Sequence, residues 1–336
     1  MENHSRIPGR REFLRTLGGG ALGLALAGAV GAAGTKPLRG VFPIGQTPMD
    51  ESGALDLECL QNEVKFCNRY KVHGFAWPQI ASGWTTLSEK ERLEGAEAIL
   101  AAGKRGATAL VIGMQDKENK IDQAVAYAKH AAKNGADAII SLPPDKADDK
   151  AMIEYYKTIG QATELPLFVQ TQGDMSVDLI VEMARQIPTM KCVKDEAGDP
   201  LARITEIRQR TNDKLAVFSG KGVRTMMDEM RLGFSGHCPT TVLADFYAAA
   251  FDLWHAGKRP EAFDMFGRIQ AFNTITGAGG YLMVMRGMFK ETTRTRPMSG
   301  SGGGRSGQPA ESPLTEATKQ SIRDAWDQFM KPYLRG

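Results

Sequence analysis

The sequence of 336 residues has few of the side chains from which metal and disulfide sites are built. Its four cysteines form no Cys-x-x-Cys pair, and Cys59 and Cys67 lie on one expected helix, too far apart to bridge directly. None of the five histidines lies within metal-ligand spacing of another, which argues against a zinc site. We therefore expect no metal centre, and we interpret the cysteines as small buried apolar side chains.

An excess of charge of one sign is also missing. The formal net charge is +3 at neutral pH, and acidic and basic residues are interspersed along the expected helices. So even a balance gives no reason to expect a nucleic acid or a membrane surface as a partner. The 42% of hydrophobic residues is enough for a full core, in one large domain or two ordinary ones.

A hydrophobic run long enough to cross a membrane is absent as well. The apolar stretch at 17–30 is rich in Gly and Ala and falls short of the roughly 20 residues that span a bilayer. Arg10 and Arg11 precede it and small residues follow, the pattern of a signal peptide. Adjacent arginines before Phe-Leu resemble the twin-arginine signals that carry folded proteins. We expect residues 1–34 to be a signal read by the twin-arginine translocon, and the processed protein to be periplasmic or extracellular, with no membrane contact.

From Gly40 onward, short β-rich segments alternate with longer amphipathic segments. The expected strands are 40–44, 74–77, 108–113, 138–142, 167–171, 191–194, 215–219 and 233–236. Eight strands, each followed by a helix, predict an α/β fold, a parallel (β/α)8 TIM barrel over residues 38–240. A doubly wound sheet is the alternative, but no glycine-rich fingerprint follows the first strand.

After the eighth strand the pattern becomes helical only. Helical periodicity is present at 243–255, 260–274, 280–289 and 315–330, and the Gly/Ser-rich segment 298–313 is expected to be an exposed loop. We expect residues 241–336 to form a C-terminal helical extension of the barrel. Such an extension is suited to carry an oligomer contact, and we expect a homo-oligomer, either a dimer or a tetramer.

One short segment, MKCVKDEAGDP at 190–200, raises a chemical question, because it places a lysine at the end of an apolar strand. Lys194 closes the sixth expected strand, and the chemistry of barrel enzymes lies at the C-terminal ends of the strands. A crowded apolar mouth disfavours an ammonium group and favours the free amine, which attacks carbonyls. The alternative is a lysine that pairs with Asp195 or extends into solvent, and position alone does not separate the two.

Around Lys194 the sequence resembles the dihydrodipicolinate synthase / N-acetylneuraminate lyase superfamily. The resemblance is carried by VKDEAGD at 193–199 and FSG at 218–220, with shorter matches from about Gly40 to the C-terminal helices. Members of the superfamily are class I aldolases and lyases of 2-oxo acids, usually pyruvate, that form a Schiff base on a lysine and need no metal or other cofactor. The resemblance assigns that lysine to Lys194 and implies a barrel with C-terminal helices.

The sequence departs from the superfamily at groups that contact the substrate. The loop that holds the pyruvate carboxylate, Gly-Thr/Ser-Thr-Gly-Glu in the family, corresponds to QIASG at 79–83, which leaves Gln79 and Ser82 as polar candidates. The tyrosine that acts as general acid/base corresponds to Gln170, whose amide does not exchange a proton at neutral pH. Gln170 is therefore expected to orient a water or hold an oxyanion, and authentic dihydrodipicolinate synthesis is not expected.

Further candidates for substrate binding follow the ends of expected strands; they are Thr171, Ser219, Gly220, Lys221 and His237. Lys221 either binds a carboxylate or points to solvent. For His237, which should face the barrel mouth, packing in the core is the main alternative. Asp195 and Glu196 are interpreted as caps of the following helix, because carboxylates favour helix N-termini.

Two functions of different classes remain open. The first is a Schiff-base lyase, aldolase or dehydratase that acts on a 2-oxo acid or a sugar-acid derivative through Lys194 and Gln170. The second is a non-catalytic, exported ligand-binding or scaffold protein on a retired aldolase barrel, in which Lys194 only anchors a ligand. Formation of a covalent imine separates the two.

The first prediction concerns export. Replacing both Arg10 and Arg11 by lysine is expected to leave the full-length protein in the cytoplasm, because the twin-arginine translocon reads the paired arginines. Cell fractionation followed by mass measurement checks this, with Lys36→Arg as a control outside the signal. A double variant that is still processed and exported contradicts the assignment.

Overall fold

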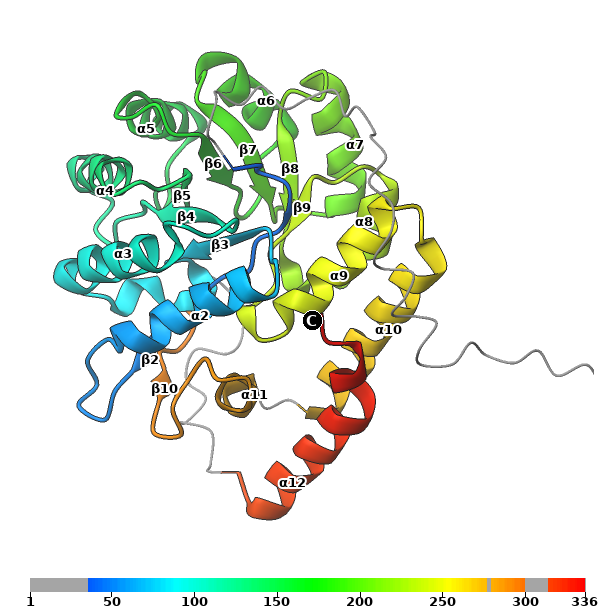
Figure 1. Cartoon of the computed structure of the whole chain (residues 1–336). Helices are drawn as coiled ribbons and strands as arrows, with labels where there is room; N and C mark the ends of the chain where they lie inside the picture. The colour runs from blue at the N-terminus through cyan, green and yellow to red at the C-terminus, as the bar shows by residue number, and fades with distance from the viewer. Residues whose placement is uncertain (1–35, 277–278, 300–313, 336) are drawn as a thin grey trace, which may run out of the picture. The chain divides into compact units, whose positions relative to one another are not determined.

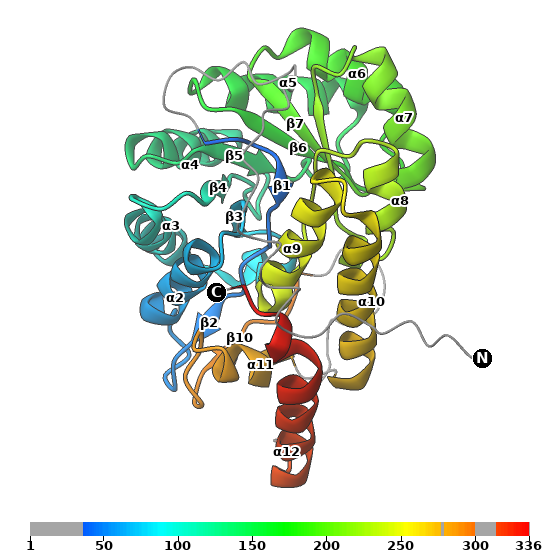
Figure 2. The same cartoon turned by 45° about the vertical axis from the view of Figure 1, so that its right-hand side comes forward.

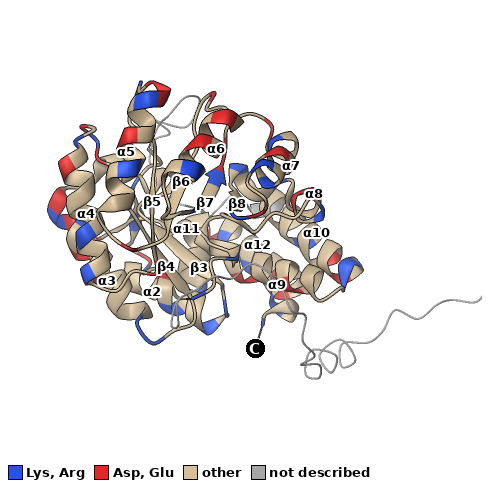
Figure 3. Cartoon of the chain, turned by 90° about the horizontal axis from the view of Figure 1, so that it is seen from above, with Lys and Arg blue, Asp and Glu red and all other residues tan. Residues whose placement is uncertain are grey.

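A computed structural model describes residues 36–276, 279–299 and 314–335. The expected signal at 1–34 and residues 300–313 of the expected loop lie outside the described residues. Within the described part of the chain, no helix is long and apolar enough to cross a membrane. Lys and Arg alternate with Asp and Glu over the helices that surround the sheet (Figure 3).

Eight parallel strands form the centre of the fold (Figure 1). They are β1 (Gly40–Val41), β3 (Gly74–Trp77), β4 (Ala109–Gly113), β5 (Ala138–Ser141), β6 (Leu167–Gln170), β7 (Met190–Asp195), β8 (Ala216–Ser219) and β9 (Gly236–His237). Their order is β1-β9-β8-β7-β6-β5-β4-β3, and Ile44 closes the circle by bridging to Ala76 on one side and Thr240 on the other. The predicted TIM barrel with a C-terminal helical extension is confirmed.

A helix follows each of seven strands and packs on the outside of the barrel, as Figures 1 and 2 show. These helices are α2 (Leu57–Arg69), α3 (Glu89–Gly103), α4 (Ile121–Lys133), α5 (Asp149–Gln161), α6 (Val177–Gln186), α7 (Pro200–Arg210) and α8 (Met226–Arg231). Local capping sets their starts: Ser88 and Glu91 form a capping box at α3, and Asp199 accepts from the amide of Leu201 at α7.

The eighth strand lies later in the chain than the sequence predicts. Residues 233–236 were expected, but β9 is Gly236–His237. The reason is that Gly233 adopts a left-handed conformation (φ 87°) and its amide bonds back to Met230, so the turn after α8 continues to this point.

Alternate residues of the strands point into the barrel and fill it. The inward side chains form one apolar cluster of Phe42, Ile44, Ala76, Ala109, Val111, Ala138, Ile140, Phe168, Cys192, Phe218 and Cys238. The rings of Phe42, Phe168 and Phe218 contact one another, with centroids 5.1–6.1 Å apart. The intervening residues point outward and pack against the helices in a second, larger cluster.

The C-terminal region adds helices beside the barrel. They are α9 (Ala244–His255), α10 (Arg259–Thr276), α11 (Gly279–Met285) and α12 (Glu316–Ala325). A short antiparallel pair, β2 (Pro48–Met49) with β10 (Arg294–Thr295), joins this region to the loop after β1. Residues 294–299, which we call the strap, continue from there: the amide of Ser299 donates to Ile80 O (2.9 Å) and that of Arg296 to Thr47 O (3.0 Å).

Arg286 is a buried contact point for four elements. It makes two hydrogen bonds to Asp245, of 2.9 and 2.6 Å, and the side chains of the pair are only 3% and 1% exposed. Its guanidinium also lies over the rings of Phe66 (4.6 Å) and Trp326 (4.7 Å). The planar cation therefore connects α2, α9 and the segment after α12 to the end of α11.

The second prediction concerns this pair. Arg286→Met should lower the free energy of unfolding by about 3–5 kcal/mol, because it leaves the Asp245 carboxylate buried without a partner. Urea denaturation measures the change, and Arg286→Met combined with Asp245→Leu should recover part of it. The control is Arg185→Met, which removes an exposed partner of Glu182 and should change little. Equal effects of Arg286→Met and the control would refute a structural role for the pair.

Candidate active site

Lys194 enters the barrel mouth because of its position on β7. Cys192 belongs to the inward cluster, and Lys194, two residues later, points to the same side. The residue is 4% exposed and lines a cavity of about 390 Å³. The three packed phenylalanine rings also point into the barrel, and Phe218 pairs in register with Lys194. Lys194 thus lies at the C-terminal end of its strand, next to the apolar cluster that fills the barrel.

The ammonium of Lys194 has a carboxylate partner. Its Nζ lies 3.1 Å from Glu196 Oε2. The side-chain amide of Gln170 donates to the same oxygen, and the main-chain amide of Lys221 donates to Glu196 Oε1 (3.1 Å). Burial by itself raises the pKa of Glu196, but the Lys194 charge and these hydrogen bonds outweigh burial and hold the pKa below its ordinary value. The group is therefore a carboxylate at neutral pH.

The role expected for the two acidic residues after Lys194 is wrong. Glu196 turns into the barrel mouth, and the residue that caps α7 is Asp199. Asp195 points outward, where it accepts two hydrogen bonds from Arg203 (2.8 and 3.0 Å). The side chains diverge because successive residues of a strand face opposite sides.

Gly220 makes room for the carboxylate. A Cβ atom at this position would collide with Glu196 Oε1 and lie 3.1 Å from Lys194 Cε. Gly220 thus lies beside the Lys194–Glu196 pair, and the absence of a side chain there leaves room for the carboxylate.

Three predicted substrate-binding residues face away from the mouth. Thr171 donates to Asp195 (2.8 Å) and accepts from the amides of Glu196 (2.8 Å) and Ala197, so it orients the segment that carries Glu196. Ser219 donates to Glu229, and His237 Nδ1 lies 2.8 Å from the same carboxylate. The placement of His237 at the mouth is therefore wrong: the ring is fully buried between the barrel and the helices.

The loop after β3 uses its polar groups internally. The Ser82 hydroxyl donates to Gly45 O (2.6 Å) and accepts from the amide of Gln79 (3.0 Å). The Gln79 side chain donates to Gln115 Oε1 (3.1 Å), and its own Oε1 has no partner within the described chain. Both side chains are fully buried outside the cavity lining, so neither takes the carboxylate-binding position that the sequence assigned to it.

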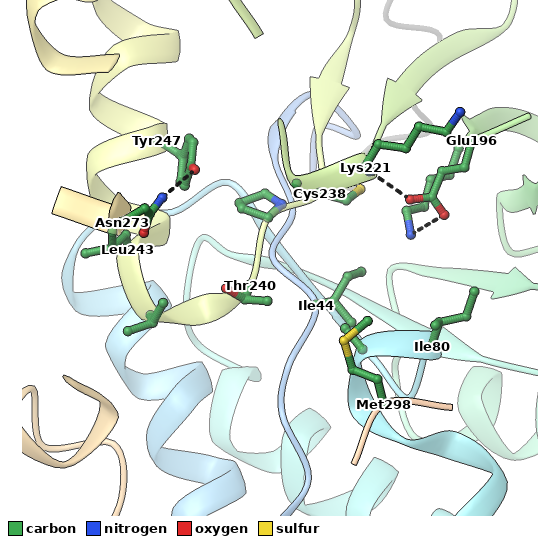
Figure 4. A pocket seen from close by; sticks show the side chains of 15 residues that line it. Ile44, Ile80, Glu196, Lys221, Cys238, Thr240, Leu243, Tyr247, Asn273 and Met298 are labelled. Atoms are coloured by element: carbon green, nitrogen blue, oxygen red, sulfur yellow. Dashed lines mark hydrogen bonds and ion pairs between the residues drawn. The ribbon is translucent and has the colours of Figure 1, made fainter. Parts of the chain in front are cut away.

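The cavity extends from Lys194 toward the C-terminal helices (Figure 4). Its apolar lining consists of Ile44, Ile80, Ala81, Cys238, Pro239, Val242, Leu243 and Met298, and its polar side chains are Lys194, Glu196, Lys221, Thr240, Tyr247 and Asn273. At the rim of the cavity, the Lys221 ammonium donates a hydrogen bond to the main-chain oxygen of Gly198, which fixes the position of this cation. Among the described residues, no group of His, Cys, Asp or Glu is arranged to hold a metal ion.

Glu196 is the candidate site residue that sequence reasoning missed. A signal was present, since Glu196 lies two residues after Lys194 and an extended chain returns to the same face after two residues. No comparable signal marks Tyr247, Asn273 or Met298, because their approach to the mouth depends on how distant helices and the strap pack.

Comparison with known proteins identifies the family of this chain. Residues 37–287 match the Dihydrodipicolinate synthetase family. The chain belongs to this family, whose members are class I Schiff-base aldolases and lyases. A 4-hydroxy-tetrahydrodipicolinate synthase of Haloarcula marismortui is 29% identical over 196 residues, which cover 56% of this chain and 62% of that enzyme. One of Rhizobium meliloti is 28% identical over 206 residues, 59% of this chain and 67% of that enzyme.

Solved structures support the fold. An N-acetylneuraminate lyase of Mycoplasma synoviae superposes with a TM-score of 0.71 at 19% identity, covering 87% of this chain and 98% of that one. A Clostridium difficile structure described as CdNal in complex with mannosamine gives 0.73 at 20% identity, over 87% and 99% of the two chains. At identities this low, the superpositions establish only the fold, a barrel with its helical extension. The reaction of this family member has to be inferred from its own side chains.

Proposed function

We propose that the protein is a Schiff-base-forming lyase or aldolase that uses Lys194 against the carbonyl of a 2-oxo acid. The observation that carries the proposal is the Lys194–Glu196 pair, 3.1 Å apart and open to a cavity at the C-terminal end of a barrel strand. A lysine becomes a nucleophile when a nearby base removes its proton, and Glu196 is within reach to do so.

The pair has the groups that imine formation requires. Glu196 accepts a proton from the Lys194 ammonium, and the free amine attacks the carbonyl carbon of the substrate. The nitrogen passes one of its protons to the carbonyl oxygen, which gives a carbinolamine. Glu196 then returns its proton to that hydroxyl, which leaves as water while the nitrogen becomes an iminium. The iminium withdraws electrons from the adjacent carbon, so that a carbon–carbon or carbon–oxygen bond further along the substrate can break.

Gln170, at the position of the family tyrosine, positions the base in this scheme. Its amide donates to Glu196 Oε2, while its own Oε1 is buried and has no partner within the described chain. Gln170 is fully buried and does not line the cavity, so its part in this scheme is to support the carboxylate of Glu196. Gln170 was expected to orient a water or hold an oxyanion; in this scheme proton transfer is assigned to Glu196, and Gln170 supports that carboxylate.

The alternative is a non-catalytic ligand-binding or scaffold protein. Two observations favour this alternative: the family tyrosine is absent, and the polar groups of Ser82 and Gln79 hydrogen-bond within the protein and not to a substrate carboxylate. A binding protein has no need of a base beside the lysine, however, and a buried ion pair is costly to maintain without a function. Trapping of the imine decides between the two.

We also propose that the protein is exported and assembles as a homo-oligomer. Arg10 and Arg11 support the first point, together with four cysteines that are all free and buried. The C-terminal helical extension supports the second, and the mass of the protein in solution measures it.

The third prediction tests the nucleophile. Pyruvate with borohydride should add one reduced adduct to the protein, and peptide mapping should place it on Lys194. Lys194→Met should abolish the adduct while the fold is retained, because methionine keeps most of the volume. Lys221→Met is the matched control and should still form the adduct. Modification of Lys221 instead, or no adduct with any 2-oxo acid, refutes the proposal.

The fourth prediction tests the base. Glu196→Gln should slow adduct formation and turnover by about 10²–10⁴-fold, because the amide cannot accept a proton. In the native protein the carboxylate becomes protonated only as pH falls through the lowered pKa of Glu196. Activity should therefore persist through mildly acidic pH and decrease only at lower pH. The variant should lack this acid limb. Glu206→Gln, an exposed change on α7, is the control. Full activity in Glu196→Gln contradicts the role.

A further inference from the structure

Most of the residues that line the cavity beyond the Lys194–Glu196 pair are apolar, and together they form what we call the apolar wall. On one side are Ile80 and Ala81 from the loop after β3, and on the other are Val242 and Leu243 from the turn before α9. Met298, from the strap, lies near Ile80 in the same lining (Figure 4). The part of a ligand that extends beyond Lys194 therefore meets apolar side chains from the loop after β3, the strap and the turn before α9.

Hydrogen bonds hold this wall in place. The amide of Ser299 donates to Ile80 O (2.9 Å), and the Ser299 hydroxyl accepts from the amide of Thr85 (3.1 Å). The hydroxyl of Thr86 donates to Gly83 O (2.7 Å), and that of Ser82 donates to Gly45 O. The hydroxyls of the loop are thus used within the protein, and the surface that the loop gives to the cavity is aliphatic.

Polar side chains are scarce along the rest of the lining. Tyr247 and Asn273 lie together beside Leu243, at the end far from Glu196, where the Asn273 amide donates to the Tyr247 hydroxyl (3.4 Å) (Figure 4). Thr240 is the remaining neutral polar side chain of the lining. A polyhydroxylated chain would give up its hydrogen bonds to water against this wall without replacement, whereas an apolar group gains by leaving water.

We propose that the substrate is a 4-hydroxy-2-oxo acid whose fourth carbon carries an aryl or branched alkyl group. This inference rests on the proposed function and names its substrate class. Lys194 Nζ forms an iminium with C2 and releases water, and Glu196 takes the proton of the C4 hydroxyl. The C3–C4 bond breaks, its electron pair enters the enamine, and an apolar aldehyde leaves. Protonation at C3 and hydrolysis of the imine then release pyruvate and restore the lysine.

The test compares two substrates with the same reacting atoms. One is 4-hydroxy-2-oxo-4-phenylbutanoate, and the other carries a polyhydroxylated chain on C4 in place of the ring. Pyruvate release gives kcat/KM, and borohydride trapping gives the adduct on Lys194. The phenyl substrate should be favoured at least about tenfold. Val242→Thr, which keeps the shape and replaces a methyl group with a hydroxyl, should reduce the preference severalfold, and so should Ile80→Thr. Val181→Thr on α6 is the matched control and should leave the preference unchanged.

The outcomes separate this inference from the function on which it rests. Lys194 adducts with both substrates, but equal turnover or a preference for the polyhydroxylated one, would overturn the substrate class and leave the Schiff-base lyase intact. No adduct with either substrate or with pyruvate would overturn the function itself, and the substrate class with it. An unchanged preference in both Val242→Thr and Ile80→Thr would also count against the apolar wall as its cause.

Discussion

Each strand of a closed barrel offers its side chains only two directions, into the barrel or outward to the helices. The fold and the site of this protein both follow from that constraint. Cys192 and Lys194 point inward, while Val193 and Asp195 point outward to the helical layer. A shift of one residue would place the Asp195 carboxylate in the mouth and the lysine among the helices. The register of β7, which turns Lys194 into the barrel, therefore decides the chemistry of the mouth as well as the packing of the core.

The candidate site depends on four residues that fit one another. Gln170 donates to Glu196, and Gly220 leaves the space that the carboxylate occupies beside Lys194. Burying two opposite charges is costly unless hydrogen bonds satisfy the remaining atoms, and Gln170 and the amide of Lys221 do this for Glu196. Where the superfamily places a tyrosine, this chain has an amide that supports a carboxylate. The departure from the family pattern at Gln170 is therefore understood only together with Glu196.

The C-terminal extension is part of the site rather than an appendage to it. Arg286 fixes this region against α2 and α9 through Asp245 and a group of aromatic rings. The strap then returns to the loop after β3, where Ser299 bonds to Ile80 and Met298 joins the lining of the cavity. The barrel thus supplies Lys194 and Glu196, and the extension helps to line the cavity beside them.

The sequence by itself determined the alternation of strands and helices, the barrel and the placement of Lys194 at the end of a strand. These features depend on local periodicity and on a short motif, and both are set by residues that are neighbours in the sequence. The outward direction of Thr171, Ser219 and His237 follows from the same period of two, once the inward residues of each strand are known. The partnership of Gln170 with Glu196 and the approach of Met298 to the mouth were decided only by the tertiary structure. They join segments far apart in the chain, and such contacts depend on how the barrel closes and how the C-terminal helices pack against it.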